Sequence, residues 1–145
     1  MLNDIYNHRI LALAADIPRL GRLANPDATA TARSKICGSV VIVDLKVEGG
    51  RVTAFAHEVK ACALGQASSA IMGRHVVDST ADELRAIRET ARRILTADGK
   101  PPSGKWADLE VLEPLRDYKA RHASILLTFD AVVDALDQIA AARTG

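Results

Sequence analysis

The chain has 145 residues, of which 48% are apolar, 26% charged and 3% aromatic, a size and composition that predict one globular domain over residues 1–145 and exclude a disordered chain. Its formal charge of +1 provides no basic excess for binding nucleic acid, so we expect no such partner. No run approaches the roughly 18 apolar residues of a membrane-spanning helix and no signal peptide is visible, so we expect a soluble, cytoplasmic protein without membrane contact.

The chain begins with an amphipathic pattern and continues into a loop. The apolar residues Ile5, Ile10 and Leu13 lie on one stripe and predict a helix over residues 2–15. The residues that follow, up to Ile36, have the composition of a loop, and their alternating Ala and Thr suit a short edge strand.

The strongest strand signal lies in the middle of the first half of the chain. Residues 40–47 are rich in β-branched side chains and predict a strand. Residues 48–50 (Glu-Gly-Gly) suit a tight turn, and residues 51–59 predict the second strand. This pattern predicts a β-hairpin.

Helical patterns fill the rest of the chain. A helix rich in small residues is expected from Cys62 to Gly73. Thr80 caps the next predicted helix, with Glu83 reaching back to complete a capping box. A short helix around residues 108–112 precedes Pro114, and a final amphipathic helix covers residues 124–142, with Ser124 as its N-cap. This order predicts an α+β fold with the helices packed on one face of a small antiparallel sheet.

Two cysteines frame the predicted hairpin. Cys37 comes just before its first strand, and Cys62 comes just after its second strand, at the start of a helix. The hairpin should bring both thiols to one end of the sheet, and a helix N-terminus favours a thiolate. Paired thiolates bind zinc or iron–sulfur units. The alternative is that both are inert buried thiols.

Histidines are the other candidate ligands. His57 alternates in register with Phe55 and Val59, which favours a histidine of the sheet core or surface over a metal ligand. His122 precedes the last predicted helix, where a ligand role and a capping role are equally reasonable. No catalytic motif, such as a glycine-rich phosphate loop or a nucleophile elbow, is present.

These motifs resemble a known family. Cys37-Gly38 before a hairpin, then Cys62 opening a helix with the residues Gly-Gln-Ala-Ser-Ser-Ala at 65–70, resembles the U-type iron–sulfur scaffold proteins, which comprise the NifU N-terminal domain, IscU and SufU. The resemblance covers about residues 17–135. The stretch from 108 to 121 is most similar to the SufU branch, in which residues 89–107 would correspond to an insertion.

The resemblance implies a SufE/NifU-like fold, with helices on one face of a three-stranded antiparallel sheet. Family members receive persulfide sulfur from a cysteine desulfurase, hold iron, zinc or a [2Fe–2S] unit, and pass clusters on to apo-proteins or carriers. Cys37 and Cys62 match the first two family cysteines. Ser39 stands at the position of the family's aspartate, and Ser124 at that of its third cysteine.

The two serines change the expected chemistry. A neutral hydroxyl binds zinc or iron far more weakly than a thiolate or a carboxylate. His122, two residues before Ser124, would compensate if its loop bends inward, and Arg121 would lower the pKa of a nearby cysteine.

Three functions follow as hypotheses. The first is a scaffold or sulfur-accepting adaptor that is no enzyme itself but acts as the carrier or activator of a cysteine desulfurase, with Cys37 or Cys62 as persulfide acceptor. The second is a pseudo-scaffold that keeps the fold and a docking surface but binds no metal, as Ser39 and Ser124 suggest. The third, ranked lowest, is a thiol-redox protein with a reversible Cys37–Cys62 disulfide.

Overall fold

The computed structural model describes residues 8–35 and 38–144. Cys37 and the first part of the predicted N-terminal helix therefore lie outside the described residues. Along the chain the elements are α2 (His8–Ala15), β1 (Ala28–Arg33), β2 (Val40–Glu48), β3 (Arg51–Lys60), α3 (Ala63–His75), α4 (Ala81–Thr96), the 3₁₀ helices η1 (Gly104–Leu115) and η2 (Lys119–Arg121), and α5 (His122–Thr144).

The three strands form one antiparallel sheet in the order β1-β2-β3. The predicted hairpin is β2 and β3, joined at Gly49 and Gly50, which have φ angles of 60° and 80°. Positive φ at both turn positions is typical of a type I′ turn, whose twist matches that of the strands. The alternating Ala and Thr form β1, which pairs with β2 as an edge strand.

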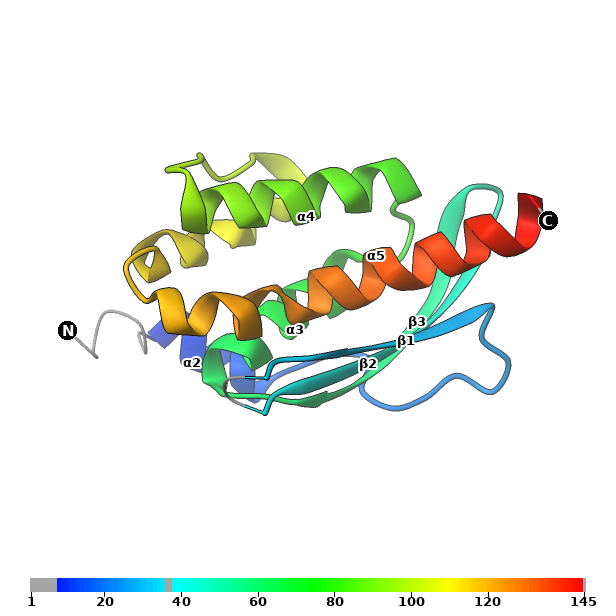
Figure 1. Cartoon of the computed structure of the whole chain (residues 1–145), viewed down its shortest axis with the longest axis horizontal. Coiled ribbons are helices and arrows are strands. Elements are labelled where there is room, and N and C mark those ends of the chain that lie inside the picture. The colour runs from blue at the N-terminus through cyan, green and yellow to red at the C-terminus, as the bar shows by residue number, and fades with distance from the viewer. Residues whose placement is uncertain (1–7, 36–37, 145) are drawn as a thin grey trace.

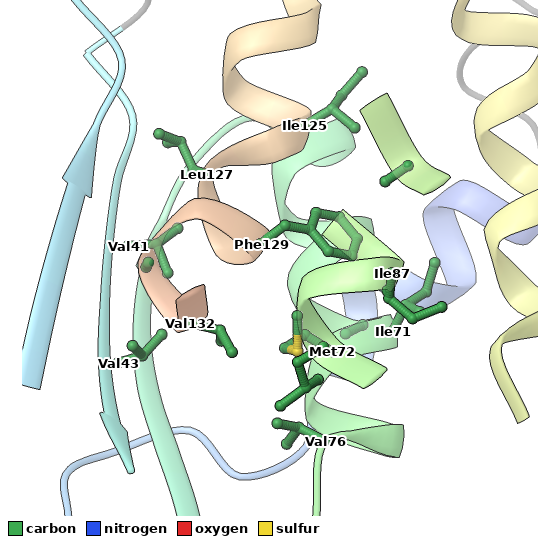
Figure 2. Close-up of a cluster of buried hydrophobic side chains, with 14 of the residues drawn as sticks. Val41, Val43, Ile71, Met72, Val76, Ile87, Ile125, Leu127, Phe129 and Val132 are labelled. Atoms are coloured by element: carbon green, nitrogen blue, oxygen red, sulfur yellow. The ribbon is translucent and has the colours of Figure 1, made fainter. Parts of the chain in front are cut away.

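Helices cover one face of the sheet, as Figure 1 shows, with α5 closer to the strands than α4. The covered face presents Val41 and Val43 of β2, and these contribute to the buried core. Figure 2 shows them on one side of the α5 residues Phe129 and Val132, with Met72 of α3 on the other side. The predicted α+β architecture is confirmed.

The boundaries of α3 and η1 differ from the prediction. α3 does not end at Gly73 but continues to His75. A Cβ at Gly73 would lie 2.8 Å from the carbonyl oxygen of Pro18, so the glycine serves close packing within the helix. The segment near residue 108 is a 3₁₀ helix that begins at Gly104 and continues through Pro114, with a kink at Trp106.

The capping box before α4 is only half formed. The side chain of Thr80 accepts a hydrogen bond from the backbone N–H of Glu83, as predicted. The carboxylate of Glu83 instead accepts hydrogen bonds from the indole N–H of Trp106 and the hydroxyl of Ser79. This carboxylate therefore fastens η1 to the beginning of α4, a contact between distant residues that local spacing does not reveal.

The connection between α2 and β1 is held against the uncovered face of the sheet by one buried carboxylate. Asp44 of β2, with a fully buried side chain, accepts two hydrogen bonds from the guanidinium of Arg22, at 2.7 and 3.1 Å. It also accepts hydrogen bonds from the backbone N–H of Leu23 and the hydroxyl of Thr29. This set satisfies a charge that would otherwise be costly to bury.

Among the helices of the described segments, none has the length and apolar character needed to cross a membrane.

Candidate functional site

One thiol and two hydroxyls come together at the end of the sheet where α3 begins. Cys62 is the N-cap residue of α3 and follows β3 after a single residue. Ser39 lies immediately before β2, the strand that pairs with β3. Ser124 is in the first turn of α5. Three segments that are far apart in the sequence therefore contribute to this site.

The three side chains form a continuous chain of contacts. The oxygen atoms Oγ of Ser39 and Ser124 are 3.1 Å apart, and Ser124 Oγ lies 3.5 Å from the sulfur of Cys62. Ser39 and Ser124 are 4% and 1% exposed, whereas Cys62 is only partly buried. The hydroxyls thus form the floor of the site, and the thiol lies nearer its surface.

The sequence-based interpretation of Ser124 as a helix N-cap is wrong. α5 begins two residues earlier, at His122, so the Ser124 side chain is free to point away from its own helix end. It bonds to Cys62 and Ser39 instead of capping α5.

Gly65 allows the beginnings of α3 and α5 to meet at this site. A Cβ at this position would lie 2.8 Å from Ser124 Oγ and 2.8 Å from the Cβ of Ala61. Any side chain here would have to displace the hydroxyl that contacts Cys62. Close approach of two helices is a common reason for a buried glycine in a helix.

The pKa of the Cys62 thiol is lowered from its ordinary value. Burial is the largest influence and raises the pKa, but several stabilising groups together outweigh it. They are the hydroxyl of Ser124, the backbone N–H groups of Gly65 and Leu64 at the start of α3, and the positive charge of Arg121. Donors at a helix N-terminus and a nearby cation are the usual means of stabilising a thiolate.

The described donors do not match a closed zinc site. Structural zinc takes four ligands from thiolate, imidazole and carboxylate groups. Within residues 8–35 and 38–144, no three His, Cys, Asp or Glu side chains are grouped in a way that would hold a metal ion. Cys62 instead has the hydroxyl of Ser124 beside it, and that hydroxyl is in turn hydrogen-bonded to Ser39.

His122 is not among the groups that contact Cys62. Its Nε2 donates a hydrogen bond to the carbonyl oxygen of Leu115, at 3.1 Å. The residue lines a different hollow, together with Asp98, Arg116 and Asp117. The inward bend that would bring His122 to the site is absent from this arrangement, whereas Arg121 does act electrostatically on Cys62.

His57 is a core residue, as its register with Phe55 suggests. It is fully buried and donates a hydrogen bond from Nε2 to the carbonyl oxygen of Pro18, at 2.9 Å. Burial lowers its pKa, against the smaller raising effect of that carbonyl. The ring packs edge-on against Phe55, so His57 supports the fold at a distance from the thiol.

Sequence reasoning missed the contact between Ser39 and Ser124. Both stand at positions where the family has ligands, but their hydrogen bond spans 85 positions of the chain. The sequence places Gly65 only within a small-residue helix. Its close approach to Ser124 depends on the packing of α5 against α3.

Comparison with known proteins agrees with this architecture. The model of the family described as the NifU-like N terminal domain matches residues 5–124. The iron-sulfur cluster assembly scaffold protein IscU of Thermotoga maritima is 24% identical over 135 residues, which cover 93% of this chain and 94% of that protein.

Two solved structures extend the comparison. One is the crystal structure of the N-terminal part of a nitrogen-fixing NifU-like protein from Brucella abortus. Its sequence is 60% identical to this chain, and the two structures superpose with a TM-score of 0.93 over 96% of each chain. A putative iron-sulfur cluster assembly scaffold protein for the SUF system from Fervidobacterium islandicum shares the fold at 19% identity, with a TM-score of 0.84 and coverage of 92% of this chain and 98% of that one. On the strength of the family match and these relatives, the chain belongs to the family of NifU-like N-terminal domains.

Proposed function

We propose that this chain accepts persulfide sulfur from a cysteine desulfurase and passes it on in iron–sulfur cluster assembly, with Cys62 as the accepting thiol. The observation that carries the proposal is the environment of Cys62. It combines partial exposure with a hydroxyl 3.5 Å away and with the N-terminal N–H groups of α3. Family membership supports a role in iron–sulfur cluster assembly, and the thiol environment supports the choice of Cys62.

The transfer is a thiol exchange that needs no external oxidant or reductant. The Cys62 thiolate attacks the outer sulfur of a persulfide on the desulfurase cysteine, and a new S–S bond forms on Cys62. The S–S bond of the donor breaks, and its electron pair leaves with the donor cysteine as a thiolate. The proton of the outer sulfur stays with it, so Cys62 becomes a persulfide.

The surroundings of Cys62 suit each stage of this exchange. Because a thiolate accepts hydrogen bonds but cannot donate them, Ser124 must donate to the attacking sulfur. Ser124 can then accept a hydrogen bond from Ser39, so that both hydroxyls donate along the chain of contacts toward the sulfur. Partial exposure of the thiol leaves it accessible to a donor sulfur.

Transfer of labelled sulfur tests this function. The full chain is incubated with a purified cysteine desulfurase and radiolabelled cysteine, then separated without reductant. We expect label on the chain, released by a thiol reductant, and none on the Cys37→Ser/Cys62→Ser double variant. A chain that acquires no reducible label would overturn the proposal. The Ser68→Ala variant is a suitable control, because its hydroxyl bonds to Leu64 within α3 and not to the thiol.

A second candidate function is a pseudo-scaffold that docks partners but holds no metal. The hydroxyl pair of Ser39 and Ser124 favours it, because neither group is a good ligand for zinc or iron. Iron, zinc and acid-labile sulfide are measured per chain after anaerobic purification and again after reconstitution. Less than about one metal ion per ten chains, together with no sulfur transfer, would favour the pseudo-scaffold. Stoichiometric metal lost in both Cys37→Ser and Cys62→Ser would exclude it.

A further inference from the structure

A groove lies on the uncovered face of the sheet, at the same end as Cys62. It has a volume of about 460 Å³. Its described lining residues are Arg33, Val40, Ile42, Glu58, Val59 and Lys60.

Strand register explains the form of this groove. Val40 pairs with Arg33 of β1 on one side and with Lys60 of β3 on the other. Directly paired residues present their side chains on the same face of a sheet. A row of cation, valine and cation therefore crosses all three strands, and Ile42 occupies the middle of a neighbouring row.

The floor of the groove is apolar and only partly buried. Val40 and Ile42 are both intermediate in exposure, whereas the alternating residues Val41 and Val43 are buried under the helices. The connection between α2 and β1 covers the sheet farther along, where Arg22 and Leu23 bond to Asp44. Within residues 8–35 and 38–144, no residue of that connection lines the groove at the end nearest Cys62.

The charges around the groove are unbalanced in favour of cations. Within the described part of the chain, neither Arg33 nor Lys60 has an ion-pair partner. Glu58 is the one acid among the described lining residues, and its carboxylate lies 3.9 Å from the guanidinium of Arg22. Two uncompensated cations on either side of apolar residues would complement a segment with an apolar side chain between carboxylates.

We propose that this groove docks such an acidic and apolar segment of the sulfur-donating desulfurase. The inference rests on the proposed function, because the donor must approach Cys62. Lys60 is only two residues from that thiol, so a protein held in the groove is positioned beside the accepting sulfur. The groove would hold the desulfurase in position while Cys62 accepts the sulfur.

Charge reversal with a matched control tests the proposal. Dissociation constants are measured between the full chain and a purified cysteine desulfurase from the same organism, at two ionic strengths. We expect Arg33→Glu/Lys60→Glu to bind about tenfold more weakly and to lose most of the salt dependence. Lys46→Glu/Lys100→Glu changes the net charge equally at positions outside the groove lining and should bind like the parent chain. Equal weakening in both variants would overturn the proposal.

The apolar floor is tested separately. Ile42→Thr keeps a β-branched side chain in the central strand but removes apolar surface, and it should also weaken binding. Unfolding curves of all variants confirm that the fold is retained. Unchanged affinity in a folded Ile42→Thr variant would contradict an apolar contact in the groove.

Photo-cross-linking identifies the occupant. A benzophenone side chain introduced at Thr31, which pairs with Ile42, should cross-link to a desulfurase segment that contains Asp or Glu. A cross-link to a second copy of this chain, or to a desulfurase segment without acidic residues, would overturn the proposal. If the parent chain binds no desulfurase, both the proposed function and the docking surface are contradicted. If it binds and accepts sulfur with the groove variants unaffected, only the docking surface fails.

Discussion

The Cys62 thiol contacts groups of α3 and α5, and Ser124 of α5 is in turn hydrogen-bonded to Ser39 at the start of β2. The N–H groups at the start of α3 and the Ser124 hydroxyl of α5 stabilise a negative sulfur, against the opposing effect of burial. Ser39 extends this chain of hydroxyls into the interior. At the scale of single residues, Ser124 is therefore a positioning residue for the thiol.

Removal of the Ser124 hydroxyl should make Cys62 less reactive at neutral pH. In a Cys37→Ser background, which leaves Cys62 as the sole thiol, Ser124→Ala removes one donor to the sulfur and raises its pKa. We expect alkylation by iodoacetamide at pH 7 to slow, because a higher pKa leaves a smaller fraction of the thiol as thiolate at that pH. The rate-against-pH profile should move to higher pH.

The matched control for that measurement is Ser68→Ala, which removes a buried hydroxyl of α3 that bonds to the Leu64 carbonyl. Its alkylation profile should coincide with that of the background chain. An unchanged profile for Ser124→Ala would show that its hydroxyl does not stabilise the thiolate.

His57 should make stability depend on pH. Burial keeps the pKa of the folded side chain below its ordinary value of 6.5. As the pH falls below 6.5, the unfolded chain takes up a proton that the folded chain resists, so the free energy of unfolding decreases. The stabilisation is complete above that pH and is progressively lost between it and the lower folded-state pKa.

Urea unfolding at several pH values from about 7.5 to about 5 measures this effect. His57→Gln keeps a donor for the Pro18 carbonyl but removes the titrating group. We expect a flatter dependence of unfolding free energy on pH for this variant. Parallel curves for the variant and the parent chain would contradict the assignment.

At the scale of secondary structure, Asp44 joins the connection between α2 and β1 to the central strand. Replacing Asp44 by Ala removes the acceptor for Arg22, Leu23 and Thr29 together. We expect a loss of about 2–4 kcal/mol in unfolding free energy, because three part-buried donor groups lose their shared acceptor. Trypsin should also cleave faster after Arg22, since the connection loses its attachment to the sheet.

Asp134→Ala is a useful comparison for that variant. Asp134 is an exposed residue of α5, and its replacement should change stability by less than about 0.5 kcal/mol. Equal stability and equal proteolysis in the Asp44→Ala and Asp134→Ala variants would contradict the role assigned to Asp44.

At the scale of the whole molecule, local patterns in the sequence predict most of the architecture. The hairpin, the edge strand and the small-residue helix all follow from residue types and their spacing, because each depends on neighbours along the chain. The continuation of α3 through Gly73 could not be predicted this way. The packing of Gly73 against Pro18 inside the helix is visible only in three dimensions.

The candidate site was only partly predictable for the same reason. The position of Cys62 at a helix N-terminus follows from the hairpin before it and the helical pattern after it. The bond between Ser39 and Ser124 depends on where α5 begins and on the absence of a side chain at Gly65. The orientation of His122 toward Leu115 likewise depends on how η1 and η2 lead into α5.

The most direct test of the account is to locate the transferred sulfur. After reaction with a persulfide-loaded cysteine desulfurase, thiols are blocked and the chain is digested with trypsin, which separates Cys37 and Cys62 into the peptides 36–46 and 61–74. We predict a persulfide on peptide 61–74 in the parent chain and in Cys37→Ser, and its loss in Cys62→Ser. A persulfide confined to peptide 36–46, or found on neither peptide, would contradict the assignment of Cys62 as the sulfur acceptor.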